Sequence, residues 1–308
     1  MIRTFINVNE VSEKLDHNAI KVMLDAESRY RGQLFKVVNM INKRRKKIKV
    51  LLLGGPSCAG KTSTARLIKE IFEKSKHRRA IIISMDDFFV NREDTPLLPN
   101  GQKDFDSLRA VNFEQMEQCF TKLFKTGEAK FPRFNFETGL NEPDYYDLNL
   151  KDNPIIIFEG LHVLNPDLTK YLGTTGFFKM YISTLRGFKN DKGIKMSTRQ
   201  VRLVRRIIRD IERRKFTPEK TFELWKNVCD AEDAYIAPYK DDVDYYIDTT
   251  HDYEIALYKT ELFKIMAEKR DQLKRLSFLD LFDNTISLQR EQLPETTLMW
   301  EFIDREID

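Results

Sequence analysis

Short apolar runs alternate with amphipathic segments along most of this chain, and the alternation predicts strands and helices in turn. Mostly apolar runs of strand length lie at residues 48–54, 79–84, 155–160, 177–183 and 244–248. Such runs are typical of a parallel sheet that is covered on both faces. Amphipathic segments with helical spacing lie between them, at 64–72, at 108–124 and from 201 onward. The pattern predicts an α/β fold with a parallel sheet and helices on both faces.

Apolar residues at helical spacing also precede and follow this alternating core. Between residues 10 and 42 they predict two helices with a break near Gly32, and from Ile255 to Leu276 they predict one long helix. The apolar end of the chain, 293–303, is expected to dock on the rest of the protein. We therefore expect a helical extension over 1–45, a core domain over 46–250 and a second helical extension over 251–308.

The first apolar run ends in a glycine-rich stretch with a defined chemical role. Residues 55–62 read Gly-Pro-Ser-Cys-Ala-Gly-Lys-Thr, the G-x-x-x-x-G-K-T pattern, with a strand before it and a helix after it. In such a P-loop, backbone N–H groups and the helix N-terminus cradle a polyphosphate. Lys61 is then expected to reach the β- and γ-phosphates, and Thr62 to offer its hydroxyl to Mg²⁺. The predicted phosphate-contacting residues of this stretch are Gly55, Pro56, Ser57, Cys58, Ala59, Gly60, Lys61, Thr62 and Ser63.

Acidic residues follow two of the other predicted strands. Asp86 and Asp87 come directly after the run at 79–84, and Glu159 ends the run at 155–160. Open α/β sheets bind ligands at the carboxyl ends of their strands, so an acid there can face a phosphate on the P-loop. Glu159 is placed like the second-strand acid that holds Mg²⁺ in P-loop enzymes. The other interpretation of the Asp pair is a capped turn.

Residues 131–139 carry three aromatic side chains beside polar ones in a context typical of a loop or hairpin. Phe131, Phe134 and Phe136 are interleaved with arginine, asparagine and glutamate. Rings beside donors and acceptors suit a flat heterocyclic ligand, and three Phe side chains can also form a hydrophobic clasp. Both interpretations stay open at this point.

The helix from residue 201 has one apolar and one arginine-rich face. Between residues 201 and 220, eight basic residues stand against three acidic ones, a net charge of +5. Arginine, unlike lysine, makes bidentate contacts with phosphate, so this face favours a phosphate-clamping lid over a merely solvated surface. Residues on an arc of about 100° are Arg202, Arg205, Arg206, Arg209 and Arg213.

Composition narrows the function classes only slightly. The chain has 308 residues, is 41% hydrophobic and carries a formal net charge of +4, which is too balanced to demand a nucleic-acid partner. The three cysteines are far apart and have no zinc spacing, which fits a reducing compartment. Without a signal-peptide core or a long apolar run, we expect a cytoplasmic protein that does not enter the membrane. The basic run at 43–49 is interpreted as a solvated lead into a strand, and homo-oligomerisation stays open.

In combination, these residues resemble the uridine kinase/phosphoribulokinase family of P-loop kinases, and in particular its longer bacterial nucleoside-kinase-like branch. The resemblance spans most of residues 48–303. The matching pieces are the P-loop, 84–93 with Thr95-Pro96, 104–108, 132–139, 158–162 with Leu164-Asn165, 202–210, 225–239 and the end around 300–303.

The resemblance implies an ATP- and Mg²⁺-dependent kinase of a small hydroxyl-bearing acceptor, with the 5′-hydroxyl of a nucleoside favoured. It implies that Asp86 is the general base, that Asp106 holds the ribose and that Thr62 and Glu159 hold Mg²⁺. It further implies a lid at about 197–216 whose Arg202, Arg205 and Arg209 bind phosphates, with Arg205 and Lys61 acting in catalysis. The expected acceptor-binding residues are Asp86, Phe89, Asp106 and Phe134.

The sequence departs from the family pattern at three places. Leu140-Asn141 stand where similar chains carry Lys-Arg, Lys215 stands for a lid glycine, and Cys58 stands for a small Ser or Gly. Other functions that the sequence leaves open are a kinase of a phosphorylated sugar or of pantothenate, a nucleotide-binding regulator without transfer activity, and an RNA-binding module.

Overall fold

The computed structural model describes residues 4–44, 47–75, 78–98, 101–174, 176–283 and 285–305. Arg45 and Lys46, in the basic run at 43–49, lie outside these ranges. The helices are α1 (Val8–Lys43), α2 (Lys61–Lys74), α3 (Phe113–Thr126), α4 (Pro166–Thr169), α5 (Thr198–Arg214), α6 (Pro218–Tyr235) and α7 (Glu254–Leu273). The strands are β1 (Thr4–Asn7), β2 (Val50–Gly54), β3 (Ala80–Ser84), β4 (Glu128–Asn135), β5 (Leu140–Asn149), β6 (Ile155–Gly160), β7 (Phe177–Ser183), β8 (Arg186–Lys189), β9 (Lys195–Met196) and β10 (Tyr245–Asp248).

Five strands form the central sheet in the order β10-β7-β2-β6-β3, and every neighbouring pair is parallel. The five apolar runs in the sequence are these five strands, so the predicted parallel sheet is confirmed. β2, which leads into the P-loop, lies at the centre between β6 and β7. This order brings the ends of β2, β6 and β3 side by side.

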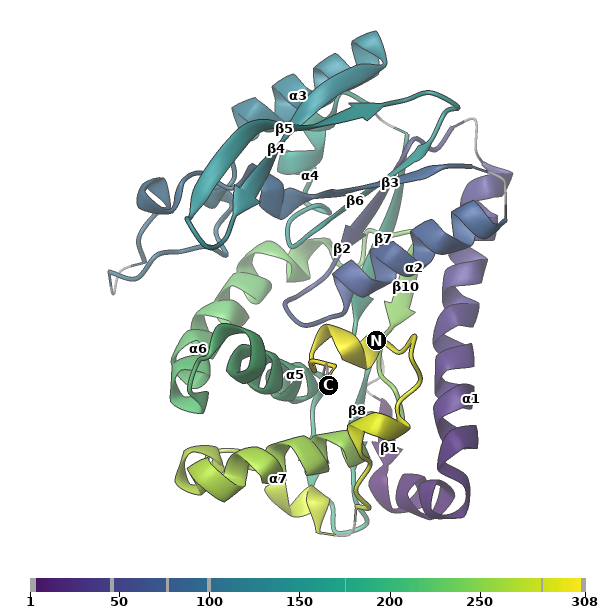
Figure 1. Ribbon diagram of the computed structural model, residues 1–308, viewed down its shortest axis with the longest axis vertical. Helices are drawn as coiled ribbons and strands as arrows, with labels where there is room; N and C mark the ends of the chain where they lie inside the picture. Colours follow the sequence, from purple (N-terminus) through teal and green to yellow (C-terminus); the bar gives the residue numbers. More distant parts are fainter. Residues whose placement is uncertain are drawn as a thin grey trace.

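The two faces of the sheet bury alternate side chains of each strand. On β2, Leu51 and Leu53 pack into one core with residues of α1, α2, α5 and α7. Val50 and Leu52 point the other way, into a core with residues of α3 and the β4–β5 hairpin. In Figure 1, α3 and the hairpin lie on one side of the sheet and α1, α5 and α7 on the other. Because both faces are covered, every residue of β2 is apolar or glycine and all five are buried.

The N-terminal extension differs from the two helices expected to break near Gly32. α1 runs through Gly32 and bends instead at Asn18, where φ is −158° and ψ is 85°. The Asn18 side chain accepts a hydrogen bond from the backbone N–H of Lys21, at 3.0 Å, and so caps the second part of the helix. Before α1, the short strand β1 pairs in parallel with β8, which pairs with β9 in a small separate sheet.

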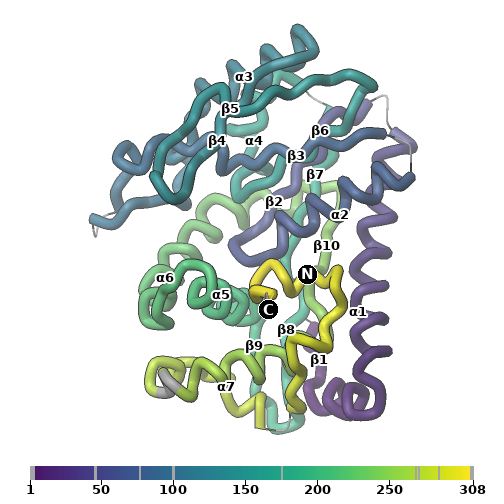
Figure 2. Tube along the Cα trace, in the orientation of Figure 1, coloured from purple at the N-terminus to yellow at the C-terminus, as the bar shows by residue number. Residues whose placement is uncertain are grey.

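The C-terminal segment returns to the centre of the molecule. In Figure 2 its yellow trace runs between α1 and α5 and reaches the start of α2. Leu298 and Met299, in the short helix η8 (Leu298–Glu301), are fully buried, as is Phe302 just after it. The expected docking of residues 293–303 is therefore confirmed.

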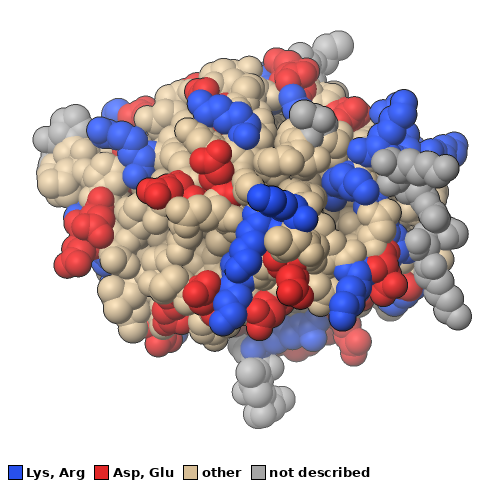
Figure 3. Space-filling view, turned by 90° about the horizontal axis from the view of Figure 1, so that it is seen from above, with Lys and Arg blue, Asp and Glu red and all other residues tan. Residues whose placement is uncertain are grey.

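The surface carries interspersed charges. On the face seen from above in Figure 3, Lys and Arg side chains lie among Asp and Glu and do not gather into one basic patch. Among the described residues, no helix is both long and apolar enough to cross a membrane.

Candidate active site

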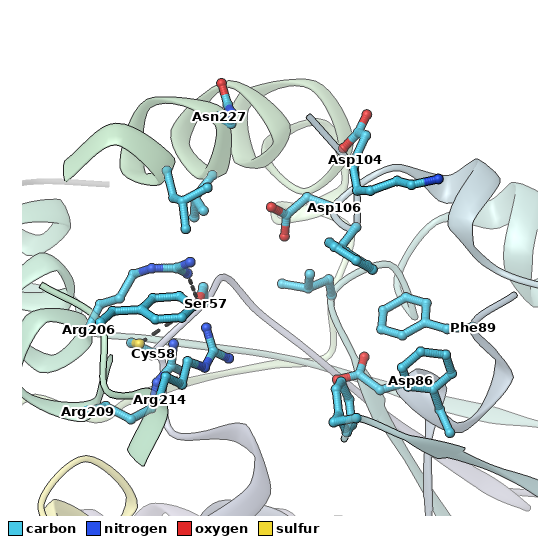
Figure 4. A pocket seen from close by; sticks show the side chains of 18 of the residues that line it. Ser57, Cys58, Asp86, Phe89, Asp104, Asp106, Arg206, Arg209, Arg214 and Asn227 are labelled. Atoms are coloured by element: carbon cyan, nitrogen blue, oxygen red, sulfur yellow. Dashed lines mark hydrogen bonds between the residues drawn. The ribbon is translucent and has the colours of Figure 1, made fainter. Parts of the chain in front are cut away.

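A cavity of about 800 Å³ opens at the carboxyl ends of β2, β3 and β6. Its walls come from the P-loop, from the residues after β3 and β6, from α5 and α6, and from the β4–β5 hairpin. Figure 4 shows arginines of α5 on one side of it and Asp86 and Phe89 on the other. The cavity therefore joins a phosphate-binding loop to an aromatic wall.

The P-loop turns sharply from β2 into α2, and two glycines make this turn possible. Gly60, which precedes α2, has a φ of +93°, a left-handed conformation that costs other residues free energy. A Cβ atom on Gly55 would lie 2.1 Å from the carbonyl oxygen of Ile182 on β7, so no side chain fits there. The turn points the N-terminus of α2, with its unpaired N–H groups and partial positive charge, toward the cavity.

The Lys61 ammonium is held close to the loop. Its Nζ donates to the carbonyl oxygens of Gly55 and Pro56, each at 3.0 Å. The exposed Thr62 side chain lies beside it in the cavity wall. The predicted phosphate-contacting residues that line the cavity are Ser57, Cys58, Lys61, Thr62 and, from α5, Arg209.

The acids after β3 and β6 meet beside Lys61. Strand register pairs Ser84 with Glu159, and the Ser84 hydroxyl donates to Glu159 Oε1 at 3.2 Å. Burial, together with the nearby Asp86 carboxylate, raises the pKa of Glu159 to about 7. Burial also raises the pKa of Asp86, which the Lys61 charge opposes. Two crowded carboxyl groups with raised pKa values are an arrangement that a bound cation would stabilise.

Asp86 and Asp87 point in different directions although they are adjacent. Asp86 lines the cavity, whereas Asp87 accepts a hydrogen bond from the Tyr146 hydroxyl on β5 at 3.4 Å. The side chain of Asn141 donates to the Asp87 carbonyl oxygen at 3.1 Å and ties the hairpin to this turn. Burial raises the pKa of Asp87 to about 6.

Of the predicted acceptor-binding residues, Phe89 and Phe134 form an aromatic part of the cavity wall. Phe89 and Phe134 pack edge to face with their ring centroids 5.6 Å apart, and the largely exposed Phe136 packs against Phe134. Phe89, Phe134 and Phe136 line the cavity, whereas Phe131 is fully buried and packs against Phe88 and Phe120, so the three Phe side chains of residues 131–139 divide between the core and an aromatic wall. Asp106 also lines it, and burial raises the pKa of its carboxyl against the opposing charge of Arg206.

Two of the arginines that were expected over the phosphates lie behind the P-loop instead. Arg205 is completely buried, forms an ion pair with Glu254 at 2.8 Å and donates to the Cys58 carbonyl oxygen at 3.3 Å. Arg202 is 2% exposed, pairs with Glu232 at 2.6 Å and donates to the Ser57 carbonyl oxygen at 3.1 Å. Arg202 and Arg205 therefore do not line the cavity in this structure, because Glu232 and Glu254 hold their side chains against the backbone of the loop.

A different set of arginines faces the cavity, and one acid organises it. Arg206, Arg209 and Arg214 all line the cavity, and Arg206 Nη1 donates to the Ser57 hydroxyl at 3.0 Å (Figure 4). Asp210, which is fully buried, lies 3.3 Å from Arg206, 2.9 Å from Arg209 and 3.3 Å from Arg214. A single carboxylate thus holds three guanidinium groups together at the site.

The sequence interpretation placed Arg206 on the arginine-rich face without naming it as a phosphate-binding residue, and it assigned no role to Arg214 or Glu301; all three line the cavity. Arg206, Asp210 and Arg214 are spaced at i, i+4 and i+8. Residues four apart share a helix face, so this spacing would have predicted that Arg206 and Arg214 lie together around Asp210. The presence of Glu301 in the cavity has no such local signal, because it depends on where the C-terminal segment folds.

The comparison with known proteins agrees with this geometry. The model of the Phosphoribulokinase / Uridine kinase family matches residues 50–256. The chain belongs to this family. The resemblance recognised in the sequence is therefore confirmed, and membership supports a phosphotransferase of the P-loop kinase fold.

Relatives within the family are distant. Uridine-cytidine kinase C of Dictyostelium discoideum is 25% identical over 231 residues, which cover 73% of this chain and 45% of that protein. A uridine kinase of Geobacillus sp. (strain WCH70) is 25% identical over 183 residues, covering 59% of this chain and 77% of that one. A solved structure titled "Structure of a Possible Uridine Kinase from Bacillus stearothermophilus" is 16% identical, with a TM-score of 0.46, and covers 70% of this chain and 99% of that one. The chain thus matches less than half of the length of the Dictyostelium relative.

Proposed function

We propose that this protein transfers the γ-phosphoryl group of ATP to a small hydroxyl-bearing acceptor, with the 5′-hydroxyl of a nucleoside as the favoured acceptor. The observation that carries the proposal is the convergence of Lys61, Thr62, Asp86 and Glu159 in one cavity that also has an aromatic wall. A protein that only bound nucleotide would need the P-loop but not a carboxylate at the acceptor end.

Each group has a role in this reaction. Asp86 accepts the proton of the attacking hydroxyl, which becomes nucleophilic as it approaches the phosphorus in line with the leaving oxygen. Lys61 and the arginines that share Asp210 neutralise the charge on the phosphates. Arg202 and Arg205 act indirectly, by holding the P-loop carbonyl groups of Ser57 and Cys58. The residues thus supply positioning and charge and form no covalent intermediate.

Magnesium fits the donors that are present. Thr62 and Glu159 offer a hydroxyl and a carboxylate, the oxygen ligands that Mg²⁺ prefers. Among the described residues, the Glu159 carboxylate has only the Ser84 hydroxyl as its hydrogen-bond partner, and burial and the Asp86 carboxylate raise its pKa although the Lys61 charge opposes the rise. Bound Mg²⁺ would offset the negative charge of Glu159 and help to neutralise the charge of the phosphates.

The acceptor end favours an uncharged ligand over a phosphorylated sugar. Two basic side chains at this end donate to backbone carbonyl oxygens, Lys103 to Glu93 at 2.6 Å and Arg92 to Phe136 at 2.5 Å. Asp106 adds negative charge next to the aromatic wall. Rings with adjacent carboxylates suit the base and hydroxyl groups of a nucleoside. We assign this chemistry to residues 46–250, with the lid at about 197–216.

An acceptor panel tests the proposal directly. Purified protein is incubated with Mg²⁺ and ATP and with uridine, cytidine, a purine nucleoside, a pentose phosphate or pantothenate, and ADP and phosphorylated product are measured. We expect turnover with a nucleoside and loss of nearly all of it in Lys61→Ala. Turnover with the pentose phosphate or pantothenate alone would refute the nucleoside assignment, and full activity of folded Lys61→Ala would refute the P-loop assignment.

The adjacent acids give a matched pair of variants. Asp86→Asn keeps the side-chain shape but cannot take a proton, so turnover should fall about 10²- to 10⁴-fold while MgATP still binds. Asp87→Asn, whose side chain points to Tyr146, should lose far less. If Asp87→Asn is the inactive variant and Asp86→Asn turns over normally, the general base is misassigned by one residue.

A further inference from the structure

A residue from the C-terminal segment reaches into the phosphate end of the cavity. The backbone N–H of Ser63, in the first turn of α2, donates to Oε2 of Glu301 at 2.8 Å. Glu301 lines the same cavity as Lys61 and Thr62. It lies 238 residues from Ser63 in the sequence and outside residues 50–256, the part that matches the family model.

The segment that carries Glu301 is firmly anchored, so this contact is built into the fold. Leu298 packs on the P-loop so closely that a Cβ atom on Gly60 would lie 2.9 Å from its side chain. Phe302, 1% exposed, lies over the guanidinium of Arg205, 4.7 Å from it. Met299 is also fully buried. Apolar anchors on both sides of Glu301 hold its carboxylate at the N-terminus of α2.

The Glu301 carboxylate occupies an N–H group that a bound nucleotide would use. The unpaired N–H groups in the first turn of α2 are the donors that bind phosphate oxygens, and the Ser63 N–H is one of them. A carboxylate on this donor satisfies it in the free protein and would repel a polyphosphate placed next to it. The same negative charge lies near Glu159 and contributes to the raised pKa of that residue.

We propose that Glu301 is a built-in competitor for the nucleotide: its carboxylate occupies the Ser63 N–H in the free protein and must leave when a phosphate takes that donor. The inference rests on the proposed function, because it assumes that the P-loop binds a nucleoside triphosphate. Since Leu298 and Phe302 anchor the segment, rotation of the Glu301 side chain is sufficient and the segment itself stays in place. The contact lowers the affinity for nucleotide and is an autoinhibitory device within the site.

Two substitutions of Glu301 and a control on the same segment test this. Glu301→Gln keeps the length of the side chain and removes its charge, and Glu301→Ala removes the competing acceptor altogether. MgATP affinity, measured by calorimetry, should rise about fivefold to twentyfold in Glu301→Gln, the upper part of the range expected for a partly buried charge at a helix terminus, and at least as much in Glu301→Ala. The control is Glu295→Gln, an exposed glutamate of the same segment, which should bind MgATP like the wild type.

A merely structural role for Glu301 predicts a different result. A carboxylate that only caps α2 would, when neutralised, lower the melting temperature and leave MgATP affinity unchanged. Unchanged or weaker MgATP binding in folded Glu301→Gln would therefore overturn the inference. The failure is distinguishable from a failure of the proposed function, in which the wild type binds no MgATP or binds it equally well after Lys61→Ala.

A structure of the wild-type protein with MgADP gives a test that does not depend on how the variants fold. The inference requires the Ser63 N–H to donate to a phosphate oxygen and Glu301 to lie in another rotamer. A bound nucleotide with Glu301 still on the Ser63 N–H would overturn it.

Discussion

Arg205 and Arg209 lie one helical turn apart on α5, yet their guanidinium groups have different surroundings. Arg205 is fully buried against Glu254, Thr249 and the backbone of the P-loop. Arg209 shares Asp210 with two other arginines and lines the cavity. The first supports the loop from behind, and the second is available to a phosphate in front of it.

The difference shows that the location of acids, and not the spacing of arginines, decides which guanidinium groups can serve a ligand. A buried guanidinium needs a carboxylate to offset the cost of removing it from water. Glu254, at the start of α7, is this carboxylate for Arg205, so the Arg205 side chain is not available to a ligand. Asp210 is one carboxylate for three arginines, so positive charge remains at the cavity in excess of its partner.

Arg205→Met should have the largest effect of the substitutions that separate these two sets. Methionine fills similar space but leaves the Glu254 carboxylate buried without its cation, which typically costs about 3–5 kcal/mol of the free energy of unfolding. Chemical denaturation monitored by fluorescence measures this. The control on the same helix is Arg199→Met, whose side chain is 37% exposed in its pair with Asp233 and should cost less than about 1 kcal/mol. An Arg205→Met protein that is as stable as the wild type but has lost turnover would show instead that Arg205 acts on the phosphates.

Arg209→Met should show the reverse. Losing one preorganised donor to the transferred phosphate typically lowers kcat about 10²- to 10³-fold, which is about 2.7–4 kcal/mol of transition-state stabilisation. The free energy of unfolding should change by less than about 1 kcal/mol, because Asp210 keeps Arg206 and Arg214 as partners. Steady-state kinetics and denaturation of the same preparation measure both quantities. Wild-type kcat in this variant would mean that the cavity-facing arginines are a solvated surface.

How much of the site the sequence predicts depends on how local its determinants are. The P-loop, Asp86 and Glu159 follow directly from strand ends, because parallel strands bring their carboxyl ends to one edge. The partner of Arg205 lies 49 residues away on another helix, and the acid on Ser63 lies 238 residues away. No periodicity within α5 or α2 carries that information. The bend of α1 was predicted at the wrong residue for another reason. Glycine commonly interrupts helices, so the break was expected near Gly32, whereas it lies at Asn18, whose side chain caps the following turn.

Lys215 offers the smallest and most specific test, because it ends the half of α5 whose arginines face the cavity. Its φ of +56° is left-handed, and its N–H bonds the carbonyl oxygen of Asp210. This conformation costs a non-glycine residue about 1–2 kcal/mol, of which the extra chain entropy of glycine offsets part. Lys215→Gly should therefore raise the free energy of unfolding by about 0.5–1 kcal/mol. Lys215→Ala, which keeps the Cβ atom and also removes the charge, should give no gain and so serves as the matched control.

The effect of Lys215→Gly on kcat tests what holds the arginines around Asp210. If they need only their carboxylate to stay in place, kcat of Lys215→Gly stays within about threefold of wild type, since that change is under 1 kcal/mol of activation free energy. A larger fall in kcat together with the gain in stability would show instead that the rigid end of α5 helps to hold Arg214 at the cavity.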